Sequence, residues 1–249
     1  MNFIFTNAKN IFLNVWIQLF FLIMSICYLP LIYILKKYMS TRQAFNLKIP
    51  LFAWNIIASL LSGYGAFYTL PMIYTNVINN GLNNQVCDIT QYNSFAGLII
   101  FIFNVTKMLE WIDTIFLILR KKNIIFLHWF HHLVTMLYCW HSTIYSCQVD
   151  ATGTWFAAIN LFVHFIMYGY YGLTSIGIRL ANSFLITFIQ FFQMIIGIFI
   201  IYKGYSLCNW QENFTGYLFA AFMYSSYLYL FFQILYKKIS IQIFGKKND

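Results

Sequence analysis

Charged residues divide the chain into long neutral intervals, and this spacing constrains the fold more than any other feature. A helix needs about 20 mostly apolar residues to cross the hydrocarbon core of a bilayer, and the intervals are of that order or longer. Because 61% of the residues are hydrophobic and only 8% are charged, the composition excludes an ordinary soluble domain. We expect an all-α polytopic membrane protein. The neutral intervals are 10–35, 49–87, 89–106, 123–149, 151–178, 180–202 and 213–236.

Two of these intervals need adjustment before they define helices. The interval 49–87 is too long for one span, and its tail, TNVINNGLNNQV, is rich in Asn and Gly and predicts a surface turn after residue 75. The third span must continue through three charged residues to residue 119, because the first basic stop follows there. A single membrane-embedded domain over residues 1–249 with seven transmembrane helices results. The predicted spans are 11–35, 51–75, 94–119, 124–144, 153–176, 181–202 and 214–236.

The orientation in the membrane follows from the basic residues, which favour cytosolic loops. Alternate loops hold most of them, whereas the opposite side holds only Lys9 and Lys203. We therefore expect a lumenal N-terminus and a cytosolic C-terminus, and the net charge of +9 reflects topology rather than nucleic-acid binding. The predicted cytosolic set is Lys36, Lys37, Arg42, Lys48, Arg120, Lys121, Lys122, Arg179, Lys237, Lys238, Lys246 and Lys247.

Cysteine positions and the chain terminus favour the endoplasmic reticulum membrane. Cys87 and Cys208 fall in two loops on the non-cytosolic side and could form a disulfide, although Cys147 lies on the same side and the pairing stays open. The ending KKND places Lys246 and Lys247 as in a cytosolic dilysine retrieval signal, and an ordinary basic tail explains it equally well.

The third span carries a polar stripe within the membrane. Lys107, Glu110 and Thr114 fall within about 60° of one another around a helix, and Asp113 flanks them. Lys107 and Glu110 are spaced to form an ion pair, which would let both charges stay buried. Buried ionisable groups point to function, and a structural brace between helices is an equally strong interpretation.

The fourth span carries three histidines, His128, His131 and His132, over about 100° of one helix face. His141 points roughly the other way, as an ordinary interfacial or core residue would. A lone buried histidine is usually structural, but three within five residues opposite a carboxylate stripe favour chemistry.

The fifth and sixth spans add two more polar stripes, so four consecutive helices could enclose one polar chamber in the cytosolic half of the membrane. In the sixth span, interhelical hydrogen bonding is at least as good an interpretation as substrate contact. The remaining interior would be apolar, which suits a long acyl chain with its activated head near the cytosol. The residues are Asn160, His164, Met167, Tyr168, Tyr170 and Tyr171 in the fifth span, and Thr187, Gln190 and Gln193 in the sixth.

Three functions compete for this chamber. The four chamber histidines with Glu110 and Asp113 could hold a single metal in a lipid oxidoreductase, although paired-iron membrane enzymes need more histidines than the five present. A seven-helix carrier or receptor would use buried charge without covalent chemistry, but no broken helix pair of the transporter kind is present. The third interpretation is metal-free acyl transfer, in which a neutral imidazole attacks a thioester, and histidine suits this chemistry because its pKa lies near neutrality.

The motifs themselves resemble those of the ELO family of very-long-chain fatty-acid elongases. The similarity covers the segment LKIPLFAWNIIASLLSGYGAF and four motifs in the family's order and spacing, from residue 47 to about residue 236. The four motifs are HxxHH at His128, His131 and His132; KxxExxDT at Lys107, Glu110, Asp113 and Thr114; NxxxHxxMYxYY at Asn160, His164, Met167, Tyr168, Tyr170 and Tyr171; and TxxQxxQ at Thr187, Gln190 and Gln193.

The resemblance implies a condensing enzyme that converts acyl-CoA and malonyl-CoA into 3-ketoacyl-CoA, carbon dioxide and CoA, without a metal or other cofactor. It implies His131 as the acyl-accepting nucleophile and His164 as an aid to decarboxylation or carbon attack. His128 and His132 would orient groups and shuttle protons. Glu110 and Asp113 would set histidine tautomers or hold the chamber together, with Lys107 balancing their charge.

The resemblance also implies the architecture and the partners. Spans two to seven would form a closed barrel around an acyl tunnel, with span one outside it, and Cys87 would pair with Cys208. CoA phosphates would meet cytosolic bases, and the protein would work beside other elongation-cycle enzymes in the same membrane, with a homodimer also open. The bases expected to contact CoA are Lys48, Arg120, Lys121 and Lys122.

Overall fold

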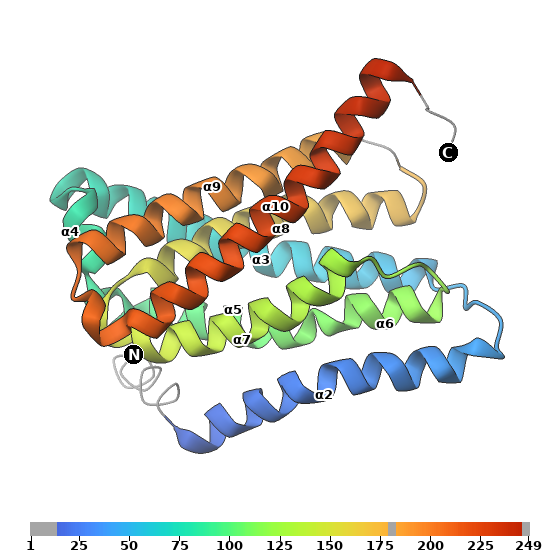
Figure 1. Ribbon diagram of the computed structural model, residues 1–249, viewed down its shortest axis with the longest axis horizontal. Helices are drawn as coiled ribbons and strands as arrows, with labels where there is room; N and C mark the ends of the chain where they lie inside the picture. Colours follow the sequence, from blue (N-terminus) through green and yellow to red (C-terminus); the bar gives the residue numbers. More distant parts are fainter. Residues whose placement is uncertain (1–13, 179–182, 246–249) are drawn as a thin grey trace.

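The computed structural model describes residues 14–178 and 183–245 and shows a bundle of long helices (Figure 1). Within these residues the chain is helical and contains no strand. Arg179 and the dilysine pair Lys246 and Lys247 lie outside the described residues, as do the first residues of the predicted spans one and six. The long helices are α2 (Val15–Ser40), α3 (Lys48–Asn80), α5 (Phe95–Leu109), α6 (Trp111–Leu119), α7 (Phe126–Val149), α8 (Thr152–Ser175), α9 (Ser183–Leu207) and α10 (Phe214–Phe244).

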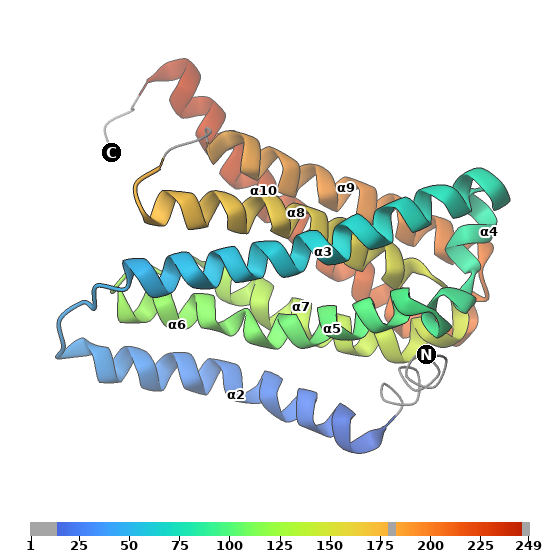
Figure 2. The same ribbon diagram turned by 180° about the vertical axis from the view of Figure 1, so that it is seen from behind.

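Seven helical rods, with α5 and α6 counted as one, run between the two ends of the bundle (Figures 1 and 2). Six rods of the described chain are long and apolar enough to cross a membrane: α2, α3, α5 with α6, α8, α9 and α10. The protein is therefore an all-α multi-pass membrane protein. α7 has 24 residues and lies among them, but it carries four histidines and is not one of the six. Seven crossings stay a prediction.

Neighbouring rods follow a cyclic order around the bundle. α3 packs on α8, α8 on α9, α9 on α10, α10 on α7, α7 on α5, and α5 again on α3. α2 contacts only α6 and α7 to any extent, so it lies on the outer side of this ring. α5 and α7 also contact α8 across the ring. The order is the one that a six-helix barrel requires, while an open acyl tunnel through it stays a prediction.

The second span is longer than predicted, because α3 continues to Asn80 and the segment expected to be a turn is largely helical. The only residue there that needs a special backbone is Gly81, with φ 79°, and it separates α3 from the short helix α4 (Leu82–Cys87). Its N–H donates to the Val77 carbonyl at 2.9 Å. The asparagines lower helix propensity by only a few tenths of a kcal/mol each, which is too little to end a helix of this length.

The third span is divided at Glu110 rather than continuous. The Glu110 N–H still donates to the Thr106 carbonyl at 2.9 Å, but the Glu110 carbonyl accepts from Asp113 N–H at 3.1 Å, an i to i+3 bond. This tighter turn separates α5 from α6 and places the Glu110 carboxyl at the junction.

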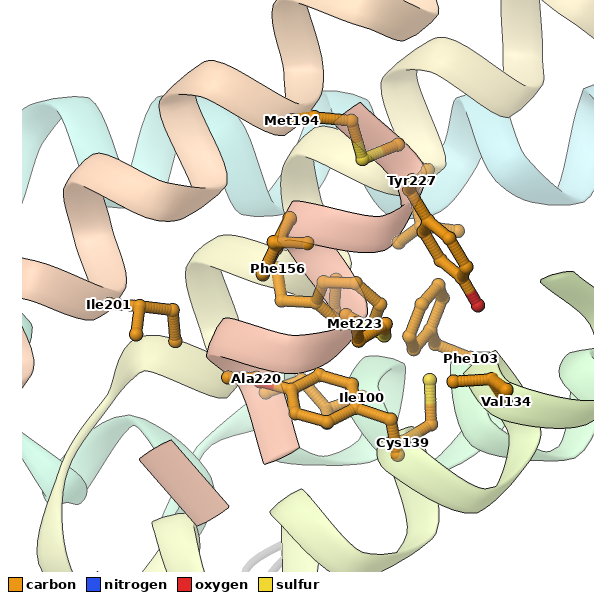
Figure 3. Packing of buried hydrophobic residues seen from close by; sticks show 14 of the residues in the cluster. Ile100, Phe103, Val134, Cys139, Phe156, Met194, Ile201, Ala220, Met223 and Tyr227 are labelled. Carbon is orange, nitrogen blue, oxygen red and sulfur yellow. The ribbon is translucent and has the colours of Figure 1, made fainter. Parts of the chain in front are cut away.

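Apolar side chains from six long helices fill the middle of the bundle, and Figure 3 shows part of this cluster. Phe103 of α5, Phe156 of α8 and Met223 of α10 lie at the centre of this cluster, and Met223 is fully buried. Tyr227 belongs to the same cluster and lies one turn along α10 from Met223. The apolar cluster therefore continues along α10 at least as far as Tyr227.

The end of the bundle formed by α4, the α7–α8 connection and the α9–α10 connection is held by a disulfide and a buried carboxylate. Cys87 and Cys208 are joined, across 121 residues of sequence. Asp150 is fully buried and accepts hydrogen bonds from Tyr217 at 2.8 Å and from the Asn213 amide at 3.0 Å. Since Asn213 is the acceptor of the one sequon in that region, its burial leaves no room for a glycan in the folded chain.

Candidate active site

A cavity of about 620 Å³ lies at the opposite end of the bundle and contains most of the residues predicted from the sequence. We call it the histidine cavity. Arg120 at the end of α6, Ser175 at the end of α8 and Lys238 in the last turns of α10 line it, so it reaches the basic end of the bundle. The predicted catalytic residues that line it are Glu110, Asp113, His128, His131, His132 and His164.

Lys107 and Glu110 form the buried ion pair that their spacing predicts. Lys107 Nζ donates to Glu110 Oε1 at 2.6 Å and to the Asn160 side-chain oxygen at 2.8 Å, and both charged side chains are almost wholly buried. His164 Nδ1 lies 3.2 Å from the same Glu110 oxygen. Lys107 Nζ lies 3.4 Å from the same nitrogen and can only donate, so the shorter contact with Glu110 favours a proton on Nδ1 that is hydrogen-bonded to the carboxylate. In that tautomer Nε2 of His164 keeps its lone pair.

Asp113 has different surroundings, and its carboxylate makes no hydrogen bond to a histidine of the described residues. Its two carboxylate oxygens accept from Trp54 Nε1 at 2.5 Å and from the Tyr168 hydroxyl at 2.6 Å. The donors come from α3 and α8, so Asp113 connects three helices at the cavity wall. Of the two roles considered for these carboxylates, this arrangement fits the structural one for Asp113.

The three α7 histidines lie close together on the cavity wall. The ring centroids of His128 and His132 are 4.5 Å apart, and those of His131 and His132 are 5.4 Å apart. His128 Nε2 is 2.9 Å from the Thr114 hydroxyl. His132 Nδ1 is buried without a hydrogen-bond partner among the described residues.

Neither His131 nor His132 makes a ring-nitrogen hydrogen bond to a described residue, but His132 is buried whereas His131 is only partly buried. Its backbone carbonyl accepts from the Tyr227 hydroxyl at 3.1 Å, and that hydroxyl also lies 2.8 Å from Thr135 Oγ1. The Tyr227 ring is 5.1 Å from the His131 ring. The side chain is thus held in place by packing while its nitrogens stay open to the cavity that it lines.

The residues predicted to contact substrate divide into two groups. Met167, Tyr168, Tyr171, Thr187 and Gln190 line the cavity. Asn160 and Gln193 are buried outside the lining, and Tyr170 is not part of it either. The α9 residues are partly used in hydrogen bonds between helices, as the alternative interpretation expects: Gln190 Nε2 lies 3.1 Å from Met167 Sδ.

Among the predicted CoA-binding bases, only Arg120 lines the cavity. Lys48 and Lys122 are exposed outside it, and Lys121 donates to the Ser40 carbonyl at 3.4 Å. Lys238 is the second cation of the lining, and the sequence analysis gave it only a topological role. Its Nζ donates to Thr187 Oγ1 at 2.7 Å. The available signal was the position of Lys238 at the cytosolic end of the predicted last span.

Two further site residues escaped the sequence analysis. Trp54 belongs to the quoted Trp-Asn segment but had no assigned role, and it donates to Asp113. Tyr28 comes from α2, which was expected to lie outside the site, and its hydroxyl is 2.8 Å from Thr114 Oγ1. Nothing in a single sequence indicates which face of α2 meets α6. Within the described residues, no three His, Cys, Asp or Glu side chains are grouped as a metal site would require.

Comparison with known proteins agrees with the motifs. The model of the GNS1/SUR4 (ELO) family matches residues 13–242. Fatty acid elongase 3 of Trypanosoma brucei brucei is 33% identical, over 86% of this chain and 82% of the relative. Very long chain fatty acid elongase 6 of Mus musculus is 36% identical, over 79% and 75%. Long chain fatty acid elongase 1 of Caenorhabditis elegans is 34% identical, over 83% and 74%. The chain belongs to the ELO family.

Proposed function

We propose that this protein is a condensing enzyme of fatty-acid elongation, a very-long-chain 3-oxoacyl-CoA synthase. It joins acyl-CoA and malonyl-CoA into 3-ketoacyl-CoA with release of carbon dioxide and CoA. The observation that carries the proposal is the contrast among the cavity histidines: His131 is partly exposed in the cavity with no hydrogen bond to a described residue at its ring nitrogens, whereas His128 and His164 have polar partners and His132 is buried. The names of the relatives support the same reaction class.

In the first half-reaction, a neutral His131 nitrogen attacks the thioester carbonyl carbon of acyl-CoA. A carbon–nitrogen bond forms and the carbon–sulfur bond breaks. The proton that the imidazole loses goes to the departing sulfur, so CoA leaves as the free thiol. The product is an acyl-imidazole on His131, which stays reactive enough to pass its acyl group on.

In the second half-reaction, malonyl-CoA loses carbon dioxide, and the electron pair of the broken carbon–carbon bond attacks the acyl carbon. The acyl–nitrogen bond breaks, and His131 takes up one proton to become neutral again. His164 assists this step with the lone pair of Nε2, which stays free while Nδ1–H donates a hydrogen bond to Glu110. His128 and His132 orient groups and relay protons. The reaction uses two thioesters and no further cofactor.

The cavity lining supports the placement of both ends of the substrate. Arg120 and Lys238 lie at the basic end, where their charges can bind CoA phosphates. Apolar side chains such as Phe116, Leu127 and Phe231 line the remaining wall and suit an acyl chain. The chain would extend past Tyr227 into the apolar cluster of Figure 3.

The cellular setting follows from the reaction and the membrane orientation. The proposal places the protein in the endoplasmic reticulum membrane with the histidine cavity facing cytosolic CoA thioesters. The remaining enzymes of the elongation cycle would act on its product in the same membrane, and self-association as a homodimer fits this setting.

The experiment that tests the function follows isotope-labelled malonyl-CoA in proteoliposomes that contain the purified full-length protein. Wild-type protein should give labelled carbon dioxide and a 3-ketoacyl-CoA two carbons longer than the acyl-CoA supplied. His131→Ala should lose product entirely. His164→Ala should still release CoA from acyl-CoA once per enzyme but lose most carbon–carbon bond formation.

The matched control is His141→Ala, which removes a histidine of the same helix that does not line the cavity. It should keep wild-type turnover. Turnover that chelators abolish and an added metal restores would replace this proposal by a metal-dependent reaction. Substrate flux across the membrane without any new carbon–carbon bond would replace it by a carrier.

A further inference from the structure

The helix outside the ring reaches the site at one residue. Tyr28 of α2 is 1% exposed, and its hydroxyl lies 2.8 Å from Thr114 Oγ1 on α6. The same Thr114 oxygen lies 2.9 Å from Nε2 of His128 on α7. Three helices are thus linked by one continuous chain of polar atoms that ends on a histidine of the cavity.

Packing on both sides holds Tyr28 in this place. Its ring lies 4.8 Å from the Trp111 ring, centroid to centroid, and 6.5 Å from the His132 ring. Two turns earlier in α2, Phe21 stacks on Trp140 with centroids 4.1 Å apart and an interplanar angle of 8°. The outer helix is therefore seated against α6 and α7 with little freedom to rotate the hydroxyl away.

Because each hydroxyl has one hydrogen, the donor and the acceptor of each of these hydrogen bonds can be assigned. Within the described part of the protein, Thr114 is the one hydrogen-bond partner of the Tyr28 hydroxyl. If Thr114 donated to Tyr28, the Tyr28 hydrogen would be buried without an acceptor, which is unfavourable. Tyr28 must therefore donate to Thr114. The single Thr114 hydrogen is then left to donate to His128 Nε2.

We infer that Tyr28 is a positioning residue that, through Thr114, holds His128 in the tautomer with its proton on Nδ1. His128 then has no free basic nitrogen at Nε2, and its other nitrogen is a hydrogen-bond donor. It can donate a hydrogen bond at Nδ1, and it can pass on that proton only as Nε2 takes one up from Thr114, so it cannot compete with His131 as a nucleophile. The catalytic consequence rests on the proposed function, whereas the tautomer does not.

The test measures the tautomer directly, by solid-state NMR of protein labelled with ¹⁵N-histidine in lipid vesicles. The His128 signals are assigned by their loss in His128→Gln. In wild-type protein, Nε2 should be unprotonated and Nδ1 protonated. Tyr28→Phe keeps the ring but removes the donor, and it should give a mixture of the two His128 tautomers. Tyr33→Phe on the exposed face of α2 should leave the spectrum unchanged.

Kinetics provide the second readout. Loss of one hydrogen bond should lower kcat in Tyr28→Phe by about 2- to 10-fold while KM stays unchanged. Thr114→Ser should retain the single tautomer and Thr114→Val should lose it. A single, unchanged His128 tautomer in Tyr28→Phe would overturn the inference, even if activity fell. If Tyr28→Phe shows the mixture of His128 tautomers but wild-type protein forms no acyl adduct, the inference is supported and the proposed function is overturned.

Discussion

Glu110 is the residue at which backbone, charge and chemistry meet. It ends one helical segment and begins the next, and its carboxylate contacts both Lys107 and His164. Burial of two charges costs free energy, and their mutual attraction offsets part of that cost, so removal of one partner leaves the other charge uncompensated. The pair thus makes a fixed anionic acceptor available to His164 inside an apolar bundle.

The pair predicts a specific stability pattern. Lys107→Met or Glu110→Gln alone leaves one buried charge without its partner and should lower the free energy of unfolding by about 3–5 kcal/mol. The double variant should be more stable than either single variant, because neither charge remains. Thermal unfolding in detergent, followed by tryptophan fluorescence, measures all three. Lys37→Met, at an exposed basic position, is the control. Additive losses in the double variant would contradict the pairing.

At the residue scale, the sequence predicted which side chains of one helix lie together, but it did not predict which residues of other helices they contact. The angular count around single helices placed Glu110 with Asp113, and His128 with His131 and His132, and the structure brings these residues to one cavity. The same count says nothing of the rotation of one helix against another. Trp54 and Tyr28 were missed for that reason, since their roles arise only from contacts between helices.

At the scale of elements, the connections far from the histidine cavity fasten the helices to one another. The disulfide ties α4 to the end of α9, and Asp150 ties the start of α8 to the start of α10. Hydrophobic attraction between helices is weak in lipid, so such fixed links matter more than they would in water. Helix ends were also the least predictable elements: α3 passes through an Asn-rich segment because only Gly81 requires a different backbone.

The disulfide should contribute measurably to stability, because it closes a loop of 121 residues. Replacing both cysteines, as Cys87→Ser with Cys208→Ser, should lower the free energy of unfolding by about 2–4 kcal/mol. Denaturant titration in detergent measures the change, and dithiothreitol should reproduce it in wild-type protein. Cys27→Ser, at an exposed free cysteine, should have no such effect. Equal stability of the double variant and wild type would show that the link is dispensable.

At the scale of the whole molecule, the two ends of the helical bundle differ in charge. The segment from the end of α2 to the start of α3, the loop after α6 and the last turns of α10 carry most of the basic residues of the described chain. α2 begins at the end opposite to that at which α10 finishes (Figure 1). The membrane class and the two ends could be predicted because composition and loop charge are properties of the chain alone. The cyclic order of the helices could not be predicted, because it depends on contacts between surfaces of similar apolar character.

The orientation is testable in sealed microsomes. With seven crossings, a glycosylation acceptor added before residue 1 should be modified, and a tag after residue 249 should be open to added protease. Glycosylation and protease protection of the N-terminus, together with protease cleavage of the C-terminal tag, would support the account. If both termini are accessible to protease, the number of crossings is even, and α7 with its histidines does not cross the membrane.

The central claim is that His131 carries the acyl group, and intact-protein mass spectrometry tests it most directly. Purified enzyme mixed with acyl-CoA, without malonyl-CoA, should release one equivalent of CoA and gain the mass of one acyl group, which peptide mapping should place on His131. Added malonyl-CoA should remove that mass as 3-ketoacyl-CoA appears. An adduct that persists in His131→Ala, or full turnover in wild-type protein that never passes through an adduct, would contradict the account.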